Sequence, residues 1–114
     1  MRFDEYLKFV PDSRKEFVRT LEDDYFSMLD VNGSIPQYTV CFHVDFQDKE
    51  KLESVLKFFN PVIVWFGQQE DYDEFNRSQI SNRYHSGVFG WFEESVVIVV
   101  NKIPVSMLQK KGVQ

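Results

Sequence analysis

The sequence predicts an α+β fold with two layers, a mixed four-stranded sheet with helices packed on one face. Three observations predict it: apolar residues at helical spacing in residues 14–29 and again after Asp48, a strictly alternating segment at 37–46, and two strand-like segments near the end of the chain. The 114 residues suit one domain, expected to span residues 1–114. A chain of this length can bury a core without a metal ion or a disulfide.

Two helices are expected before the first strand. A short one covers residues 3–10, where one face is apolar, and Pro11 ends it. Ser13 and Glu16 match a capping box, which predicts a longer helix over residues 14–29. Its apolar stripe consists of Phe17, Val18, Leu21, Tyr25, Met28 and Leu29. Asn32-Gly33 then predicts a turn.

Residues 37–46 form the clearest strand, because apolar and polar side chains alternate there without exception. Asp48 is placed to cap a following helix, which Asn60-Pro61 ends. Residues 62–66 are a buried strand. A helix between two strands of one sheet predicts a parallel pair joined by a right-handed crossover.

The last third of the chain begins with a polar segment, residues 68–83, in which one helical turn is expected around residues 71–76. Residues 87–92 and 95–101 are expected to be strands, and Glu93-Glu94 between them predicts a hairpin. The run at 96–100 is β-branched throughout, so it should lie centrally in the sheet. Pro104 ends this strand, and a short helix is expected over residues 105–111.

Composition favours a cytoplasmic chain. A single cysteine, Cys41, excludes an internal disulfide framework and fits a reducing compartment. The longest apolar run, residues 96–100, is too short to span a membrane, and acids interrupt the start of the chain where a signal peptide would be apolar. The net charge of −5 disfavours a nucleic-acid backbone. We therefore expect neither a membrane nor a nucleic-acid partner.

Cys41, His43 and Asp45 point to the same face of the predicted strand. They could supply a nucleophile with a nearby base, or part of a metal site completed by His85. The alternative is a polar or helix-covered face on which Cys41 acts as a small apolar residue. No spacing in the chain matches a catalytic, metal or nucleotide motif, so we expect no enzyme activity, no metal and no cofactor, and a Cys/His-dependent enzyme is the weaker hypothesis.

An acidic segment with two aromatic residues, residues 68–75, is the strongest candidate for a binding surface. Tyr72 and Phe75 lie three residues apart among four carboxylates. The carboxylates could attract a basic partner that the aromatics anchor, or the segment could be a solvated turn with both aromatics in the core. The predicted partner-binding residues are Glu70, Asp71, Tyr72, Asp73, Glu74, Phe75, Trp91, Glu93 and Glu94.

Small size, acidity and an aromatic content of 17% favour a protein that binds another macromolecule. We expect a non-enzymatic inhibitor, such as an immunity protein, an antitoxin or a phage anti-defence protein. Its partner would be a basic protein, for example a nuclease toxin or a defence enzyme. The alternative is a homo-oligomeric structural or regulatory interaction domain that pairs through an aromatic face or an edge strand. The chain is accordingly expected to be a monomer or a homodimer.

Overall fold

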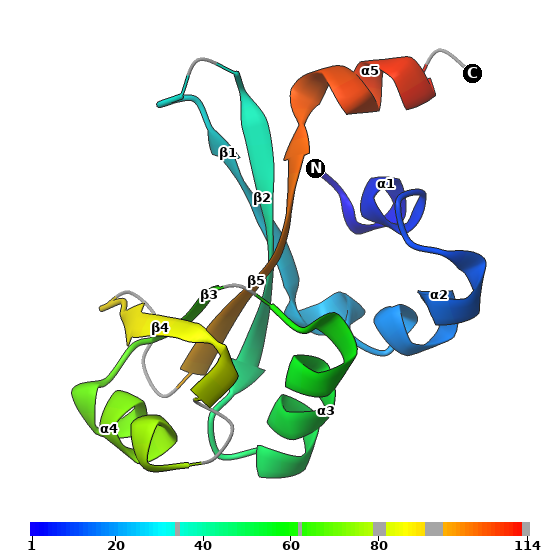
Figure 1. The fold of residues 1–114 in the computed structure, drawn as a ribbon. Coiled ribbons are helices and arrows are strands. Elements are labelled where there is room, and N and C mark those ends of the chain that lie inside the picture. Colours follow the sequence, from blue (N-terminus) through cyan, green and yellow to red (C-terminus); the bar gives the residue numbers. More distant parts are fainter. Residues whose placement is uncertain (34, 62, 79–81, 91–94, 113–114) are drawn as a thin grey trace. The chain divides into compact units, whose positions relative to one another are not determined.

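The computed structural model describes residues 1–33, 35–61, 63–78, 82–90 and 95–112 (Figure 1). The elements, in chain order, are α1 (Phe3–Leu7), α2 (Asp12–Arg19), the 3-10 turn η1 (Glu22–Asp24), β1 (Tyr25–Asp30), β2 (Gln37–Asp45), α3 (Lys49–Phe59), β3 (Ile63–Phe66), α4 (Gln69–Arg77), β4 (His85–Val88), β5 (Ser95–Pro104) and α5 (Val105–Gly112). The strands form a mixed sheet of five strands in the order β1-β2-β5-β3-β4. The expected α+β class is confirmed, and the sheet has one strand more than the four expected.

The additional strand is β1, where the sequence predicted the second half of a helix. Helix α2 ends at Arg19, and after η1 the chain enters β1. Three consecutive acids at residues 22–24 oppose a continuing helix, because carboxylates are unfavourable at its negative C-terminal end. Tyr25-Phe26 favours a strand. The predicted helix over residues 14–29 was therefore wrong beyond residue 19.

The N-terminal boundaries also differ from expectation. Helix α1 ends at Leu7 rather than at residue 10. Helix α2 begins at Asp12, so Ser13 lies inside the first turn and does not cap the helix. The first turn is instead supported by an ion pair of 2.9 Å between Lys15 Nζ and Asp12 Oδ1.

The predicted hairpin near the end of the chain was also wrong, because β3 lies between the two strands. Strand β4 pairs with β3 in parallel, and β5 pairs antiparallel with the other side of β3. Trp65 thus faces Gly87 on one side and Val97 on the other. Helix α4 is the connection between the parallel pair, and it is a full helix of 9 residues where one turn was expected. The other predicted parallel pair, β2 with β3, is separated by β5.

Helix α3 begins and ends where the sequence predicted. The Asp48 carboxylate accepts a hydrogen bond of 3.1 Å from the backbone N–H of Lys51, which caps the first turn. Asn60 ends the helix in the left-handed conformation (φ 47°, ψ 55°), and its N–H donates to the Leu56 carbonyl. Asparagine is one of the few residues that adopts this conformation readily.

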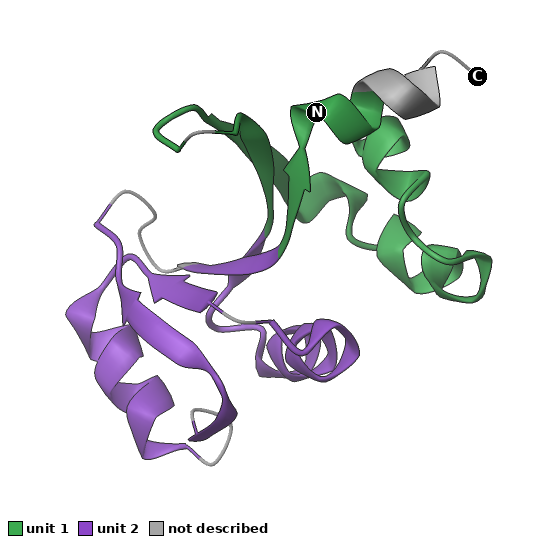
Figure 2. Ribbon diagram, turned by 45° about the horizontal axis from the view of Figure 1, so that its top comes forward, with its two compact units in different colours: residues 1–41, 101–114 green, residues 42–100 purple. Residues whose placement is uncertain are grey.

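Residue contacts divide the chain into two compact units, residues 1–41 with 101–114, and residues 42–100 (Figure 2). Strands β2 and β5 contribute residues to both units. The single-domain organisation expected from the length stays a prediction. In the part of the chain that the structure describes, no helix is both long and apolar enough to cross a lipid bilayer.

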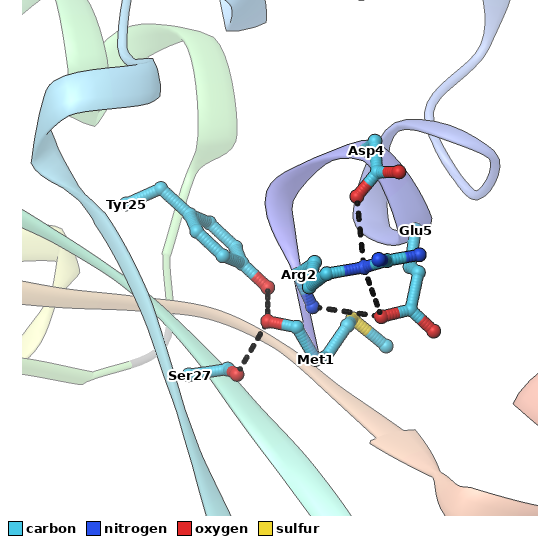
Figure 3. Close-up of polar contacts among 6 residues, drawn as sticks. All are labelled: Met1, Arg2, Asp4, Glu5, Tyr25 and Ser27. Atoms are coloured by element: carbon cyan, nitrogen blue, oxygen red, sulfur yellow. Dashed lines mark hydrogen bonds and ion pairs between the residues drawn. The ribbon is translucent and has the colours of Figure 1, made fainter.

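In the first unit, the N-terminal segment is fastened to β1. The Tyr25 hydroxyl and the Ser27 hydroxyl both donate to the Met1 carbonyl, at 2.8 and 3.0 Å (Figure 3). The Tyr25 ring also stacks on Tyr6, with ring centres 5.6 Å apart, and meets the edge of Phe3 at 5.2 Å. Helix α1 is therefore held against β1 by both hydrogen bonds and aromatic packing.

In the second unit, Phe66 of β3 is the centre of an aromatic core. Its ring contacts Phe46, Tyr72 and Phe75, with centroid distances of 5.8, 6.1 and 4.9 Å. Phe42 of β2 stacks on Phe59 of α3 at 5.0 Å. These contacts attach α3 to β2 and α4 to β3, which fixes the surface that the two helices present to solvent.

Candidate partner-binding site

Helix α4 carries most of the predicted site, and the structure sorts its residues by face. Phe75 is buried, with 3% of its surface exposed, and Tyr72 is half-buried. Both rings lie against Phe66. Phe75 therefore belongs to the core, and the prediction that it anchors a partner is corrected. The alternative, a solvated turn with both aromatics in the core, fits Phe75 but neither the helix nor the half-buried Tyr72. The i, i+3 spacing placed both residues on one face, and that face is the inner one.

The carboxylates of α4 lie on the other faces of the helix. Glu70, Asp73 and Glu74 are exposed, while Asp71 is half-buried. Asp73 Oδ1 accepts a hydrogen bond of 3.0 Å from Gln69 Nε2, one turn earlier. Acids in the first turn and Arg77 in the last are arranged favourably for the helix dipole. The acidic residues thus stabilise α4 and at the same time give it a negative outer surface.

One of these carboxylates is paired with the neighbouring helix. Lys49 Nζ, at the start of α3, lies 3.2 Å from Glu74 Oε1. The same ammonium lies 3.4 Å from the centre of the Phe46 ring, a cation–π contact. Both partners of the ion pair are more than half exposed, at 53% and 64% of their side-chain surface. The pair therefore lies at the rim of the α3–α4 junction and not in the core.

A cavity of about 320 Å³ lies at this junction. It is lined by the apolar residues Phe46, Leu52 and Phe75 and by the polar residues Lys49, Glu53, Glu74, Arg77 and Ser78. Glu53 in turn pairs with Lys57 at 2.8 Å, one turn along α3. A cavity with apolar walls and a charged rim could receive an apolar side chain from a binding partner. No sequence motif predicts this cavity, because its walls come from segments that are distant in the chain.

The alternative site on β2 does not have the properties of a reactive centre. Cys41 is fully buried, and burial raises the pKa of its thiol to about 12, which disfavours the reactive thiolate. The Asp45 carboxylate accepts a hydrogen bond of 2.8 Å from the Gln47 N–H in the turn that follows. His85 is exposed on β4. Within residues 1–33, 35–61, 63–78, 82–90 and 95–112, no group of three or more His, Cys, Asp or Glu side chains could hold a metal ion.

Three predicted partner-binding residues, Trp91, Glu93 and Glu94, lie outside the described residues. The candidate site therefore consists of the outer surface of α4 and the adjoining cavity. Comparison of the chain with protein-family models, with curated proteins and with solved structures finds no significant match.

Proposed function

We propose that this chain is a non-enzymatic acidic protein that binds a basic macromolecular partner and inhibits it by covering a basic site. An immunity protein or a phage anti-defence inhibitor would work in this way, with a nuclease toxin or a defence enzyme as its partner. The observation that carries the proposal is the exposed carboxylate set of α4, Glu70, Asp73 and Glu74. These side chains would take the positions of substrate phosphates on the partner.

The attachment of α4 to the core supports this function. Tyr72 and Phe75 pack on Phe66, so the backbone that carries the carboxylates is ordered before a partner arrives. Little backbone entropy is then lost on binding, and the affinity is correspondingly higher. Carboxylates on one exposed helix also attract a basic partner during diffusional encounter, which raises the association rate.

The cavity beside α4 supplies the apolar part of the proposed interface. Since Phe75 is used in the core, the anchoring side chain has to come from the partner. It would enter between α3 and α4 and contact Phe46 and Leu52, with Glu74 and Lys49 at the rim. An apolar centre with a charged edge is the common arrangement of protein–protein interfaces.

The test is affinity capture from a lysate of the native host with three baits. One is the wild-type chain, one carries Glu70→Lys with Asp73→Lys, and the matched control carries Glu22→Lys with Asp23→Lys. Glu22 and Asp23 are exposed carboxylates in η1, and both double variants change the net charge by the same amount. We expect wild type and control to recover one basic protein and to inhibit its activity, and the α4 variant to recover little of it.

Equal recovery of that protein by all three baits would exclude α4 as the binding surface. Recovery of the bait's own chain alone would favour the homo-oligomeric domain instead.

A further inference from the structure

The apolar walls of the cavity between α3 and α4 belong to the aromatic core of the second unit. Phe46 and Phe75 both line the cavity, and both contact the buried Phe66 ring, with centroid distances of 5.8 and 4.9 Å. Leu52, which is 3% exposed, completes the apolar wall. The volume of about 320 Å³ lies at the lower end of the range of ligand pockets, about 300–1,000 Å³. The cavity can therefore hold one large side chain, but not a helix or a strand.

The charged residues that line the cavity are balanced in sign. Lys49 and Arg77 are cations, and Glu53 and Glu74 are acids. Both carboxylates are paired already. Lys49 Nζ lies 3.2 Å from Glu74 Oε1, and the Lys57 ammonium lies 2.8 Å from Glu53 Oε1. A charged side chain of either sign would enter beside two groups of its own charge while losing its hydration, so the lining favours a neutral occupant.

The two lining cations favour an aromatic occupant over an aliphatic one. Lys49 Nζ lies 3.4 Å from the centre of the Phe46 ring, so the rim already holds one cation–π contact. A second ring placed beside Phe46 would share that ammonium. Arg77 Nε donates to the Asp73 carbonyl at 3.3 Å, and the plane of a guanidinium can stack on an aromatic ring. An aliphatic side chain would gain neither contact.

The carboxylates of the rim favour a ring that carries a polar hydrogen. A carboxylate has about four lone-pair positions, so Glu74 can accept a further donor beside Lys49, as Glu53 can beside Lys57. An indole N–H or a phenol O–H supplies this donor, whereas a phenylalanine ring does not. Tryptophan and tyrosine are also enriched among the residues that dominate the binding energy of protein interfaces.

We propose that the partner anchors itself in this cavity with one tryptophan or tyrosine side chain. Its ring packs on Phe46 and Phe75 and contacts the Lys49 ammonium, and its N–H or O–H donates to a carboxylate at the rim. This inference rests on the proposed function, because it specifies one side chain of the same partner. It adds the chemistry of the anchor, which the exposed carboxylates of α4 do not define.

The first test titrates the wild-type chain with the N-acetylated amides of tryptophan, tyrosine, leucine and arginine. Nuclear magnetic resonance reports occupancy through the methyl signals of Leu52 and the backbone amide signals of Phe75 and Ser78. We expect saturable shifts with both aromatic amides, and dissociation constants at least about fivefold below that of the leucine amide, because of the added ring contacts. No shift with the aromatic amides would overturn the inference, as would equal binding of the leucine amide or tighter binding of the arginine amide.

The second test repeats the affinity capture with Ser78→Phe, which fills the cavity with a ring from the chain itself. Ser54→Phe is the matched control, because Ser54 is exposed on α3 and lies outside the cavity lining. We expect Ser78→Phe to lower recovery of the basic partner at least about tenfold and to abolish the shifts with the tryptophan amide. Ser54→Phe should behave as wild type does, and circular dichroism checks that both variants fold.

This inference and the proposed function can fail separately. Full recovery of the partner by Ser78→Phe, together with its loss by Glu70→Lys with Asp73→Lys, would overturn the cavity inference and leave the proposed function standing. Unchanged recovery by the charge variant, with the aromatic amides bound beside Leu52, would instead reject the carboxylates of α4 as the binding surface. If Ser78→Phe does not fold, the titration of the wild-type chain decides the inference without any variant.

Discussion

Lys49 and Glu74 connect α3 to α4 through an ion pair, in which Lys49 Nζ lies 3.2 Å from Glu74 Oε1. The same ammonium lies 3.4 Å from the centre of the Phe46 ring. Exposed ion pairs contribute about 0–1 kcal/mol to stability, and an exposed cation–π contact adds about 0.5–1 kcal/mol. The larger consequence is electrostatic. Lys49 neutralises one of the three exposed carboxylates that form the proposed binding surface.

Replacing Lys49 by Gln should therefore strengthen the attraction of α4 for a basic partner. We expect the association rate constant to rise about twofold to fivefold at low ionic strength, because the field at the α4 surface becomes more negative. Stopped-flow fluorescence with the captured partner measures this rate. Lys57→Gln is the matched control, since Lys57 pairs with Glu53 within α3 and its loss changes the net charge equally. Equal acceleration by both variants would show that net charge matters and the α4 surface does not.

Phe75 is expected to matter for stability rather than for contact with a partner. Its ring is 3% exposed and its centroid lies 4.9 Å from that of Phe66. Phe75→Ala should lower the free energy of unfolding by about 3–5 kcal/mol through lost burial and a new cavity. Urea unfolding followed by circular dichroism measures the change, with Val88→Ala as an exposed control that should change it little. A Phe75→Ala protein as stable as wild type would contradict the placement of α4 on the core.

Asn60 should tolerate glycine and resist alanine. Its φ of 47° and ψ of 55° lie in the left-handed region, where a Cβ costs about 1–2 kcal/mol and glycine has no such cost. We expect Asn60→Ala to lower the free energy of unfolding by about 1 kcal/mol and Asn60→Gly to change it by a few tenths. The two urea midpoints provide the comparison, and identical midpoints would mean that α3 ends in another conformation.

The buried thiol of Cys41 predicts a loss of stability at alkaline pH. Burial raises its pKa from 9.0 to about 12, so the unfolded thiol ionises first as the pH rises. The contribution of the group is therefore constant below pH 9 and is lost as the pH rises from 9 toward 12. Burial also raises the pKa of Tyr6 to about 12, which acts in the same direction above its ordinary value of 10.0. The urea midpoint of Cys41→Ala should consequently decrease less steeply above pH 9 than that of wild type. Urea midpoints that decrease equally in wild type and in Cys41→Ala would argue against the burial of the thiol.

Cys41→Ser should leave partner binding intact, because the thiol is buried and lies outside the proposed binding surface.

Local signals in the sequence predicted the middle of the chain well. Asp48 caps α3 and Asn60 ends it, because capping and left-handed termination depend on a few adjacent residues. The alternating pattern likewise identified β2. Strand pairing was predicted less well. Tyr25, Met28 and Leu29 fit a helical stripe by spacing alone, whereas their strand conformation depends on pairing in the sheet. The insertion of β3 between β4 and β5 is likewise a long-range choice with no local signal.

In the candidate site, too, features that depend on adjacent residues were predicted and features that depend on distant residues were not. The sequence identified the acidic residues of α4, and Glu70, Asp73 and Glu74 are indeed exposed. It could not determine whether the face with Tyr72 and Phe75 turned inward, because Phe66 decides this from a different element. The pairing of Lys49 with Glu74, across 25 residues, was equally invisible to spacing arguments.

The most direct test of the central claim is the association rate of the captured partner, measured against ionic strength for wild type and the two charge-reversal variants. A binding surface on α4 predicts a wild-type rate that falls steeply with salt, because screening weakens steering. Glu70→Lys with Asp73→Lys should lower the rate at least about tenfold at low salt, while Glu22→Lys with Asp23→Lys should retain most of it. A wild-type rate that does not change with salt, or equal losses in both variants, would contradict the account.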